Sequence, residues 1–293
     1  MKLINQSAEY LPQQEGLEGV YKQIELAGRT SYLSYDKITD DSAKKFVDMI
    51  IKNKHHSVLE HGTVYLKIPV EYPIKSTYEG ACKYIFDKYT KTKSICEESD
   101  ITKGVLFTST NLRVLQENNW LNDLQYLCEP TTFHEKRLSV KVITSIGIVR
   151  ELRTHRLFSF VNESTRYCSY DKGRFDGQVT FILPYWVDRN RESNTESEVL
   201  YLESLIKAEK NYLSLIKNGC SAQQAREILP LSTKSELVMT AFESDWRHFF
   251  DLRLFGKTGE PHPDMKQLAE LIKEQFEING LWDNIMKYPS KFE

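Results

Sequence analysis

IVRELRTHRLFSFVNESTRYCSY, residues 148–170, is the stretch of this sequence with the most specific pattern of charged and polar side chains. Its basic residues are Arg150, Arg153, His155, Arg156 and Arg166. Arginine is not deprotonated in proteins, and its rigid fork of N–H donors matches the oxygens of a phosphate group. Hydroxyl and amide side chains lie between these charges, together with apolar residues such as Phe158 and Phe160. The stretch therefore indicates a site that binds an anion.

A simpler interpretation of the same stretch is a basic helix end followed by a polar loop. Basic residues near the C-terminus of a helix stabilise its dipole, and Ser, Thr and Asn are ordinary loop residues. Composition alone does not separate this interpretation from anion binding, because clusters of surface charge are common.

The order of the residues favours the anion site, because it resembles the signature of the flavin-dependent thymidylate synthases. That signature reads Arg-His-Arg, seven residues, then Ser-x-Arg-Tyr. This chain has Thr154-His155-Arg156, seven residues, then Ser164-Thr165-Arg166-Tyr167. Thr154 stands where the signature has its first arginine, and Arg153 lies one place earlier. Either residue can take the role of that arginine.

Length, charge and cysteine content place the chain in a broad class. Its 293 residues suffice for one large core, and aromatic residues, at 12%, argue against disorder. A net charge of −2 gives no global field for nucleic acid or a membrane surface. The sequence has no apolar signal core at its start and no run of membrane length. We therefore expect a cytoplasmic protein that binds neither nucleic acid nor a membrane.

The cysteines give no sign of a disulfide framework or a zinc site. Their number is odd and no Cys-x-x-Cys pair occurs, which fits a reducing compartment. The five are Cys82, Cys96, Cys128, Cys168 and Cys220.

Residues 55–61, HHSVLEH, form a second candidate site. Three histidines and a glutamate can bind a metal, but the spacing is not His-Glu-x-x-His and no further ligands complete a set, so we expect no metal. A helix C-terminus capped by histidine is a further interpretation that needs no ligand. The segment also resembles the second block of the same family, His-x-Ser/Thr-x-x-Glu-His. That resemblance makes His55, Ser57 and Glu60 flavin-binding residues.

Residues 221–253 form a third block that contains Arg226 and Arg253. Spacing alone favours two surface salt bridges for these arginines. The resemblance reverses this, because the family has an Arg before Ile/Val-Leu-Pro-Leu and another at the end of a later aromatic helix. Arg226 precedes EILPL, and Arg253 ends FFDLR. Where the family often has Asn-x-Arg, this chain has Phe242-Glu243-Ser244.

Hydrophobic periodicity and capping residues predict an α+β fold, with a central antiparallel or mixed sheet flanked by helices. Predicted strands span residues 62–70, 137–144 and 178–184. Predicted helices span residues 16–31, 145–157 and 193–218, with others beginning near residue 41, near 232–233 and at about 263. Residues 71–136 are expected to be a long, mostly helical insertion, because minimal family members join the flanking strands directly. The resemblance implies one domain over residues 1–293 with the thymidylate synthase-complementing protein fold.

The resemblance also implies the reaction. These enzymes methylate C5 of deoxyuridine monophosphate (dUMP), using methylenetetrahydrofolate as carbon donor, FAD as hydride carrier and NADPH as reductant. The chain has no Pro-Cys-Gln triplet for the cysteine-dependent mechanism of unrelated thymidylate synthases, and no Gly-x-Gly-x-x-Gly for a Rossmann domain. In the family FAD lies between subunits of a homotetramer, which is the assembly implied here.

The implied site residues fall into two sets. Arg253 is the expected catalytic cation, which stabilises the uracil ring as its N3 proton is lost. The implied dUMP-binding residues are Arg150, Glu151, Arg153, Asn162, Glu163, Ser164, Thr165, Arg166, Arg226 and Arg253. The implied FAD-binding residues are Ser31, His55, Ser57, Glu60, Thr154, His155, Arg156, Asn162 and His248.

Two other functions stay open at this stage. Thr154 and the missing Asn-x-Arg favour a non-catalytic nucleotide-binding homologue that keeps the arginine clamp. A flavoprotein acting on another pyrimidine is the third hypothesis.

Overall fold

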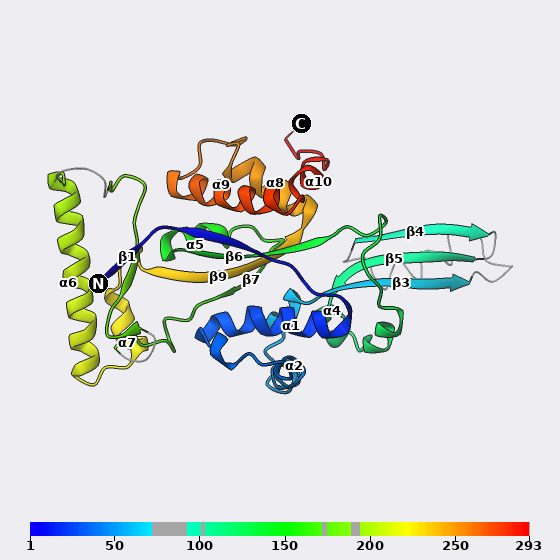
Figure 1. Ribbon diagram of the computed structural model, residues 1–293, viewed down its shortest axis with the longest axis horizontal. Coiled ribbons are helices and arrows are strands. Elements are labelled where there is room, and N and C mark those ends of the chain that lie inside the picture. The colour runs from blue at the N-terminus through cyan, green and yellow to red at the C-terminus, as the bar shows by residue number, and fades with distance from the viewer. Residues whose placement is uncertain (72–92, 101–102, 172–174, 189–193, 293) are drawn as a thin grey trace.

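A computed structural model describes residues 1–71, 93–100, 103–171, 175–188 and 194–292 (Figure 1). Helices cover both faces of a central sheet, and further elements extend from each end of it. The mixed α and β composition confirms the predicted fold class.

The central sheet consists, within the described residues, of strands in the order β2-β6-β9-β7, all antiparallel to their neighbours. The strands are β2 Ser7–Leu11, β6 Arg137–Ser145, β9 Lys234–Phe242 and β7 Ser159–Asn162. Val140 of β6 and Phe160 of β7 both pair with Met239 of β9. Strand β9 therefore lies between β6, which precedes residues 148–170, and β7, which lies within them.

One face of this sheet is covered by α8 Glu243–Arg253, α9 Pro263–Ile278 and α10 Trp282–Met286 (Figure 1). Val140, Val142 and Met239 point into this core, where they meet aromatic side chains of α8 and α9. Trp246 is fully buried, and its indole Nε1–H donates to the carbonyl oxygen of Leu138 at 3.1 Å. The sequence predicts that Trp246, Phe249 and Phe250 of α8 serve mainly in packing, and their burial in this core confirms it.

The opposite face carries α1 Gly16–Arg29 and α2 Ser42–Lys52. Short 3-10 turns follow at Thr30–Tyr32, Tyr35–Lys37 and His56–His61. A Cβ at Gly28 would lie 2.5 Å from the ring of Phe46, so glycine allows α1 and α2 to pack closely. This packing fixes the C-terminal ends of both helices. Ser31 follows α1, and the 55–61 segment follows α2.

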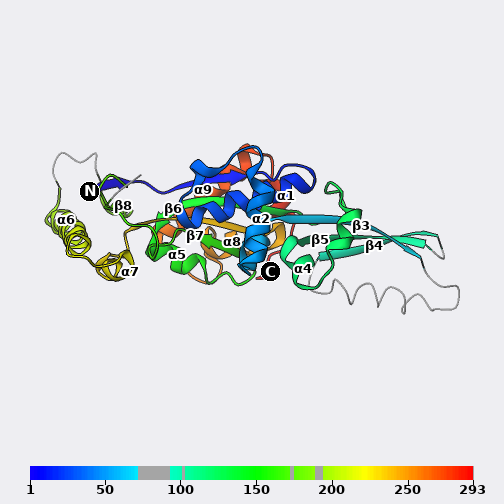
Figure 2. The same cartoon turned by 90° about the horizontal axis from the view of Figure 1, so that it is seen from below.

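At one end of the molecule the strands β3 Thr63–Glu71, β5 Lys103–Asn111 and β4 Lys93–Asp100 form an antiparallel sheet that projects from the body (Figures 1 and 2). Helix α4 Leu112–Glu117 and a 3-10 turn at Leu121–Tyr126 follow. The expectation of a mostly helical segment is wrong for residues 93–100 and 103–111. Residues 72–92 lie outside the described residues.

The sequence predicts that six apolar residues between positions 112 and 127 belong to the core, and the structure confirms five of them. Leu112 and Leu115 are buried, and three other residues pack against the same cluster, namely Trp120, Leu124 and Leu127. Leu121 is exposed, so its assignment to the core is wrong.

At the other end, β1 Lys2–Ile4 pairs in parallel with β8 Thr180–Ile182, beside the long helix α6 Glu196–Lys217 (Figure 2). Thr195 and Glu198 form a capping box at the start of α6. Helix α7 Ala222–Ala225 and a 3-10 turn at Arg226–Ile228 follow. The amphipathic pattern of residues 193–218 predicts that Ile206 points inward. This prediction is wrong, because the Ile206 side chain is 52% exposed.

Two predicted helices are corrected by the structure. The helix expected over residues 145–157 is α5 Ile146–Leu152, and residues 159–162 form β7. The helix expected from residue 232 or 233 is strand β9, and α8 begins only at Glu243. Nearly every residue of β9 is buried because helices cover both faces of the sheet, so the strand lacks the alternating pattern that marks a half-exposed strand.

Among the residues that the structure describes, no helix combines the length and the apolar character that crossing a membrane requires.

The core position of Trp246 gives a stability prediction. Trp246→Ala is expected to lower the free energy of unfolding by about 3–5 kcal/mol, because it leaves a cavity among aromatic side chains. Urea denaturation measures the change. Trp186→Ala is the control, since this half-exposed ring is expected to contribute about 0.5 kcal/mol or less. Equal effects of the two substitutions would contradict the proposed core.

Candidate functional site

The signature stretch begins on α5 and crosses the sheet as β7 before it enters a loop. The Ser145 side chain caps α5 by accepting from the N–H of Ile148 at 3.2 Å. Strand β7 ends at Asn162, whose side-chain N–H₂ donates to the carbonyl oxygen of Glu163 at 2.9 Å. The two halves of the signature thus lie at opposite ends of one short strand.

The first half of the signature contacts Arg253. The Arg253 Nε–H donates to Nε2 of His155 at 3.0 Å, and its Nη2–H donates to Oγ1 of Thr154 at 3.0 Å. Its Nη1 lies 3.8 Å from Oε2 of Glu151. The Thr154 hydroxyl donates in turn to the carbonyl oxygen of Glu151 at 2.7 Å. Thr154 is therefore the residue that faces Arg253, whereas Arg153 is exposed.

His155 accepts the hydrogen bond from Arg253 as a neutral ring. Burial, the charge of Arg253 and the nearby His248 lower the pKa of His155 to about 3. A neutral imidazole can offer its unprotonated nitrogen to the guanidinium, whereas a protonated ring has no acceptor. Arg253 keeps 20% of its side chain exposed, so the fixed cation is partly accessible from solvent.

The second half of the signature meets the two segments that follow α1 and α2. The Ser164 N–H donates to the carbonyl oxygen of Ser31 at 3.0 Å. A cavity of about 580 Å³, called the main cavity below, lies beside this contact. It is lined by Ser31, Tyr32, Lys54, His55, His56, Ser57, Val58, Arg113, Glu117, Ser164 and Tyr167. Four of the predicted site residues therefore meet at one cavity, although they come from three distant parts of the sequence.

The side chains around this cavity combine hydroxyl groups, imidazoles, cations and aromatic rings. The rings of Tyr32 and Tyr167 lie 5.3 Å apart, centroid to centroid, with planes tilted by 32°. Lys54, His55 and Ser57 are exposed at the rim. Such a set can hold a flat heteroaromatic ring between hydrogen-bonding groups and can hold an anion beside it.

Beneath the Ser164 loop lies a buried ionic cluster. Lys234 Nζ donates to Oε2 of Glu163 at 2.9 Å and to Oε1 of Glu236 at 2.7 Å. The Tyr35 hydroxyl donates to the other Glu236 oxygen at 3.0 Å. Burial opposes the charge of Lys234, but the two carboxylates outweigh it and raise the pKa of Lys234. Burial raises the pKa of Glu163, although the charge of Lys234 counteracts it.

The carboxylate of Glu163 is therefore engaged by Lys234. Its Oε2 also accepts the backbone N–H of Glu236 at 3.1 Å. These contacts anchor the signature loop to β9. The dUMP-binding role of Glu163 stays a prediction.

The remaining predicted arginines are exposed or half-buried. Arg166 Nε–H donates to Oε1 of Gln223 on α7 at 2.7 Å, which brings the signature loop next to the turn that carries Arg226. Arg226 lies 3.5 Å from Oε1 of Glu227. Arg156 is exposed.

Arg150 and Glu151 line a second cavity, of about 340 Å³, together with Tyr185, Trp186 and His262. The predicted dUMP residues therefore occupy separate surfaces of one chain. His248 stacks on Phe292 at 5.6 Å, and burial, aided by Lys291, lowers its pKa.

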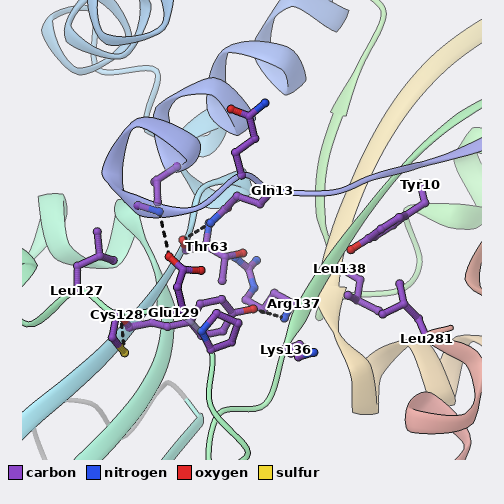
Figure 3. A pocket seen from close by; sticks show the side chains of 15 residues that line it. Tyr10, Gln13, Thr63, Leu127, Cys128, Glu129, Lys136, Arg137, Leu138 and Leu281 are labelled. Carbon is purple, nitrogen blue, oxygen red and sulfur yellow. Dashed lines mark hydrogen bonds between the residues drawn. The ribbon is translucent and has the colours of Figure 1, made fainter. Parts of the chain in front are cut away.

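A third cavity, of about 170 Å³, contains none of the predicted site residues (Figure 3). Its wall includes Gln13, whose side-chain Oε1 accepts the N–H of Thr63 at 2.8 Å while its Nε2 donates to the Thr63 carbonyl at 2.9 Å. Glu129 accepts the N–H of Gly16 at the start of α1, at 3.1 Å. These contacts hold the projecting sheet against the body.

Sequence reasoning missed two residues that line the main cavity, and it also missed the lysine of the buried ionic cluster. Arg113 and Glu117 come from α4, within the segment read as an insertion of unknown role. Lys234 was read as part of a helix, and no local motif marks it. In the part of the chain that the structure describes, no group of three His, Cys, Asp or Glu side chains is arranged to hold a metal ion.

The chain belongs to the thymidylate synthase complementing protein family, whose model Thy1 matches residues 79–278. More particularly, it is similar to proteins named flavin-dependent thymidylate synthases. It is 30% identical over 157 residues to a probable flavin-dependent thymidylate synthase of Paramecium bursaria Chlorella virus 1, covering 49% of this chain and 68% of that protein. It is also 30% identical over 104 residues to the flavin-dependent thymidylate synthase of Pyrococcus abyssi, covering 36% of this chain and 40% of that protein.

Among solved structures, the chain is similar to a UMP/dUMP methylase PolB from Streptomyces cacaoi bound with 5-Br dUMP. The TM-score is 0.45 and the identity 16%, over 98% of each chain.

The ionic cluster below the loop gives a second stability prediction. Lys234→Met is expected to lower the free energy of unfolding by about 3–5 kcal/mol, because it leaves the Glu163 carboxylate buried without a counter-charge. Adding Glu163→Gln to this variant is expected to restore part of the loss. Urea denaturation of both variants checks this.

The control is Lys141→Met on the neighbouring strand β6. Lys141 pairs with Glu9 at 2.6 Å, but that carboxylate is 58% exposed, so the expected loss is about 1 kcal/mol or less. The buried-cluster interpretation fails if Lys234→Met is no more destabilising than Lys141→Met.

Proposed function

We propose that this chain catalyses the reductive methylation of dUMP to thymidine monophosphate (dTMP), with methylenetetrahydrofolate as carbon donor, FAD as hydride carrier and NADPH as reductant. The observation that carries the proposal is the meeting of Ser31, His55, Ser57 and Ser164 at one cavity. His55, Ser57 and Ser164 come from two segments that resemble the family blocks, and Ser31 is a further residue that the resemblance implies. The fold brings them together from distant positions in the sequence. Membership of the family supports the same reaction.

The side chains at the main cavity fit a flavin. Ser31, His55 and Ser57 offer hydrogen-bonding groups for the edge of its ring system, and Lys54 offers a cation for its phosphates. When bound, the flavin supplies the redox chemistry of the reaction. The protein's contribution is to bind and orient it.

Arg253 is the residue that we assign to activation of the uracil ring. A guanidinium favours the anionic form of a ring that loses its N3 proton, because it places a fixed positive charge beside the developing negative charge. Thr154 and His155 fix the orientation of this guanidinium through two of its N–H groups. Because His155 is neutral, it does not repel the cation.

Arg166 and Arg226 are proposed to bind the phosphate of dUMP. Arg166 now donates to the uncharged amide of Gln223, and Arg226 has a loose contact with an exposed carboxylate. A phosphate dianion is a stronger acceptor than either partner, so substrate can replace these contacts.

We further propose a cytoplasmic homotetramer, the assembly that the family resemblance implies. The predicted dUMP residues lie on separate surfaces of one chain, with Arg150 and Glu151 at one cavity and Ser164 at another. A second copy that brings these surfaces together would complete the site.

A non-catalytic nucleotide-binding homologue is the alternative function, favoured by two observations. Thr154 replaces the first signature arginine, and the positions of the family's Asn-x-Arg are engaged within the fold. The Phe242 ring lies 5.4 Å from the guanidinium of Arg137, and the Ser244 N–H donates to Oε1 of Glu135 at 2.9 Å. Such a protein would bind nucleotide without flavin.

The direct test is formation of dTMP from dUMP, methylenetetrahydrofolate and NADPH by protein stripped of flavin, with FAD supplied or withheld. We expect product that depends on FAD. Tight dUMP binding without product or flavin binding would favour the non-catalytic alternative, and activity on another pyrimidine alone would favour a different substrate.

Substitution of Arg253 tests the assigned catalytic role. Arg253→Ala is expected to lower kcat by about 10²–10³-fold, the usual range for loss of one charge-stabilising donor. Arg253→Lys keeps the charge but lacks the planar fork, so it is expected to retain intermediate activity. Flavin content and thermal midpoint serve as controls and are expected to change little. Unchanged turnover in Arg253→Ala would refute the assignment.

A further inference from the structure

Helix α4 brings an arginine to the main cavity from outside the three segments that resemble the family. The Asn111 side chain caps α4 by accepting from the N–H of Val114 at 3.2 Å. Leu112 and Leu115 are buried in the core beside α1 and α2, so α4 is fixed to the body of the protein. Arg113 and Glu117 lie on the other face of the helix, where both line the cavity.

Arg113 joins two carboxylates in a chain of contacts. Its Nη1–H donates to Oε1 of Glu60, and its Nε–H donates to Oε1 of Glu117 at 2.9 Å. His56 Nδ1 lies 3.3 Å from the same Glu117 oxygen. Burial opposes ionisation of Glu117, but hydrogen bonding and the charge of Arg113 outweigh this and lower the pKa of Glu117. Glu117 therefore remains an anion that fixes one edge of the guanidinium while the other edge faces Glu60.

The contact with Arg113 changes what Glu60 can do. Glu60 lies in the 55–61 segment, which also supplies the cavity-lining residues His55 and Ser57. Glu60 itself lies behind the cavity wall and contacts the cavity-lining residue Arg113, and it is one of the residues assigned to the flavin. Within the described residues, Arg113 holds Oε1 and the other oxygen, Oε2, carries no hydrogen bond. A carboxylate that is already held through one oxygen loses little conformational entropy when its second oxygen accepts a hydrogen bond from a ligand. Binding of the ligand is therefore less costly.

Arg113 also offsets the charge of Glu60. Two carboxylates near the phosphates of FAD would repel them. Arg113 contacts both Glu60 and Glu117, so its charge offsets part of theirs and weakens this repulsion. The plain alternative is a surface ion pair between half-exposed residues, which contributes little to any function.

We propose that Arg113 is a positioning residue for the flavin, acting through Glu60. This inference rests on the proposed function, and it goes beyond it because it gives the projecting segment a role in cofactor binding. The guanidinium holds the Glu60 carboxylate in place and offsets part of its charge, and Glu60 then accepts a hydrogen bond from a donor group of the flavin.

The test is FAD binding to the full chain after flavin is stripped, measured by fluorescence titration. Arg113→Ala is expected to weaken FAD binding about tenfold, which corresponds to loss of about 1.4 kcal/mol. Arg113→Lys keeps the charge without the fork and is expected to fall between Arg113→Ala and the unchanged protein. Lys44→Ala is the control, because Lys44 and Asp48 form an exposed ion pair with the same i, i+4 spacing as Arg113 and Glu117.

A double-mutant cycle separates positioning from a general structural effect. In a Glu60→Ala background, Arg113→Ala is expected to cause no further loss of FAD affinity. The thermal midpoint of the single variant Arg113→Ala is expected to match that of Lys44→Ala. An equal loss with and without Glu60, or FAD affinity unchanged by Arg113→Ala, overturns the inference alone. Failure of the unchanged protein to bind FAD overturns the proposed function and this inference together.

Discussion

The ion pair between Lys234 and Glu163 is the interaction on which the arrangement of the candidate site depends. Lys234 begins the central strand β9, Glu163 lies in the signature loop, and Glu236 extends the cluster to Tyr35 after α1. Two backbone hydrogen bonds run alongside, from Glu163 N–H to Glu236 and from Ser164 N–H to Ser31. Burial makes this cluster sensitive to loss of one charge, because neither partner can be solvated in place. The loop that carries Ser164 is thus tied to both the sheet and the first helix.

The class of fold and much of the site could be predicted from the sequence. Helices α1 and α6, strands β3 and β6 and the packing role of Trp246 follow from periodicity and capping residues, which are local signals. The structure brings Ser31, His55, Ser57 and Ser164 to one cavity, as expected of residues with a shared ligand, while their role in binding flavin stays a prediction. Thr154, rather than Arg153, contacts Arg253, a choice that spacing left open.

The wrong secondary-structure predictions and the missed site residues share a physical cause. In each case tertiary contacts, rather than the local sequence, determine the structure. Strand β9 is buried on both faces, and its sequence, KSELVMTAF, lacks the alternation of apolar and polar residues that marks a half-exposed strand, so the segment was read as a helix. Strand β5 pairs with the distant strand β3 as well as with its neighbour β4, and no local pattern records the long-range pairing. Lys234 and Arg113 have no motif around them, and their roles come from partners at positions 163 and 60.

The side chain of Gln13 substitutes for a neighbouring strand at the start of β3. Its amide meets both the N–H and the carbonyl of Thr63, as a backbone segment would, and the loop at Cys128 covers the Tyr65 carbonyl one step further along. Unpaired strand edges invite other chains to add strands, which leads to aggregation. The base of the projecting sheet is therefore capped on this side by the chain's own polar groups, so two copies cannot join there by continuing the sheet. Strand addition at this end is left to the part of β3 beyond Leu66 and to β4, the other edge strand of the described sheet.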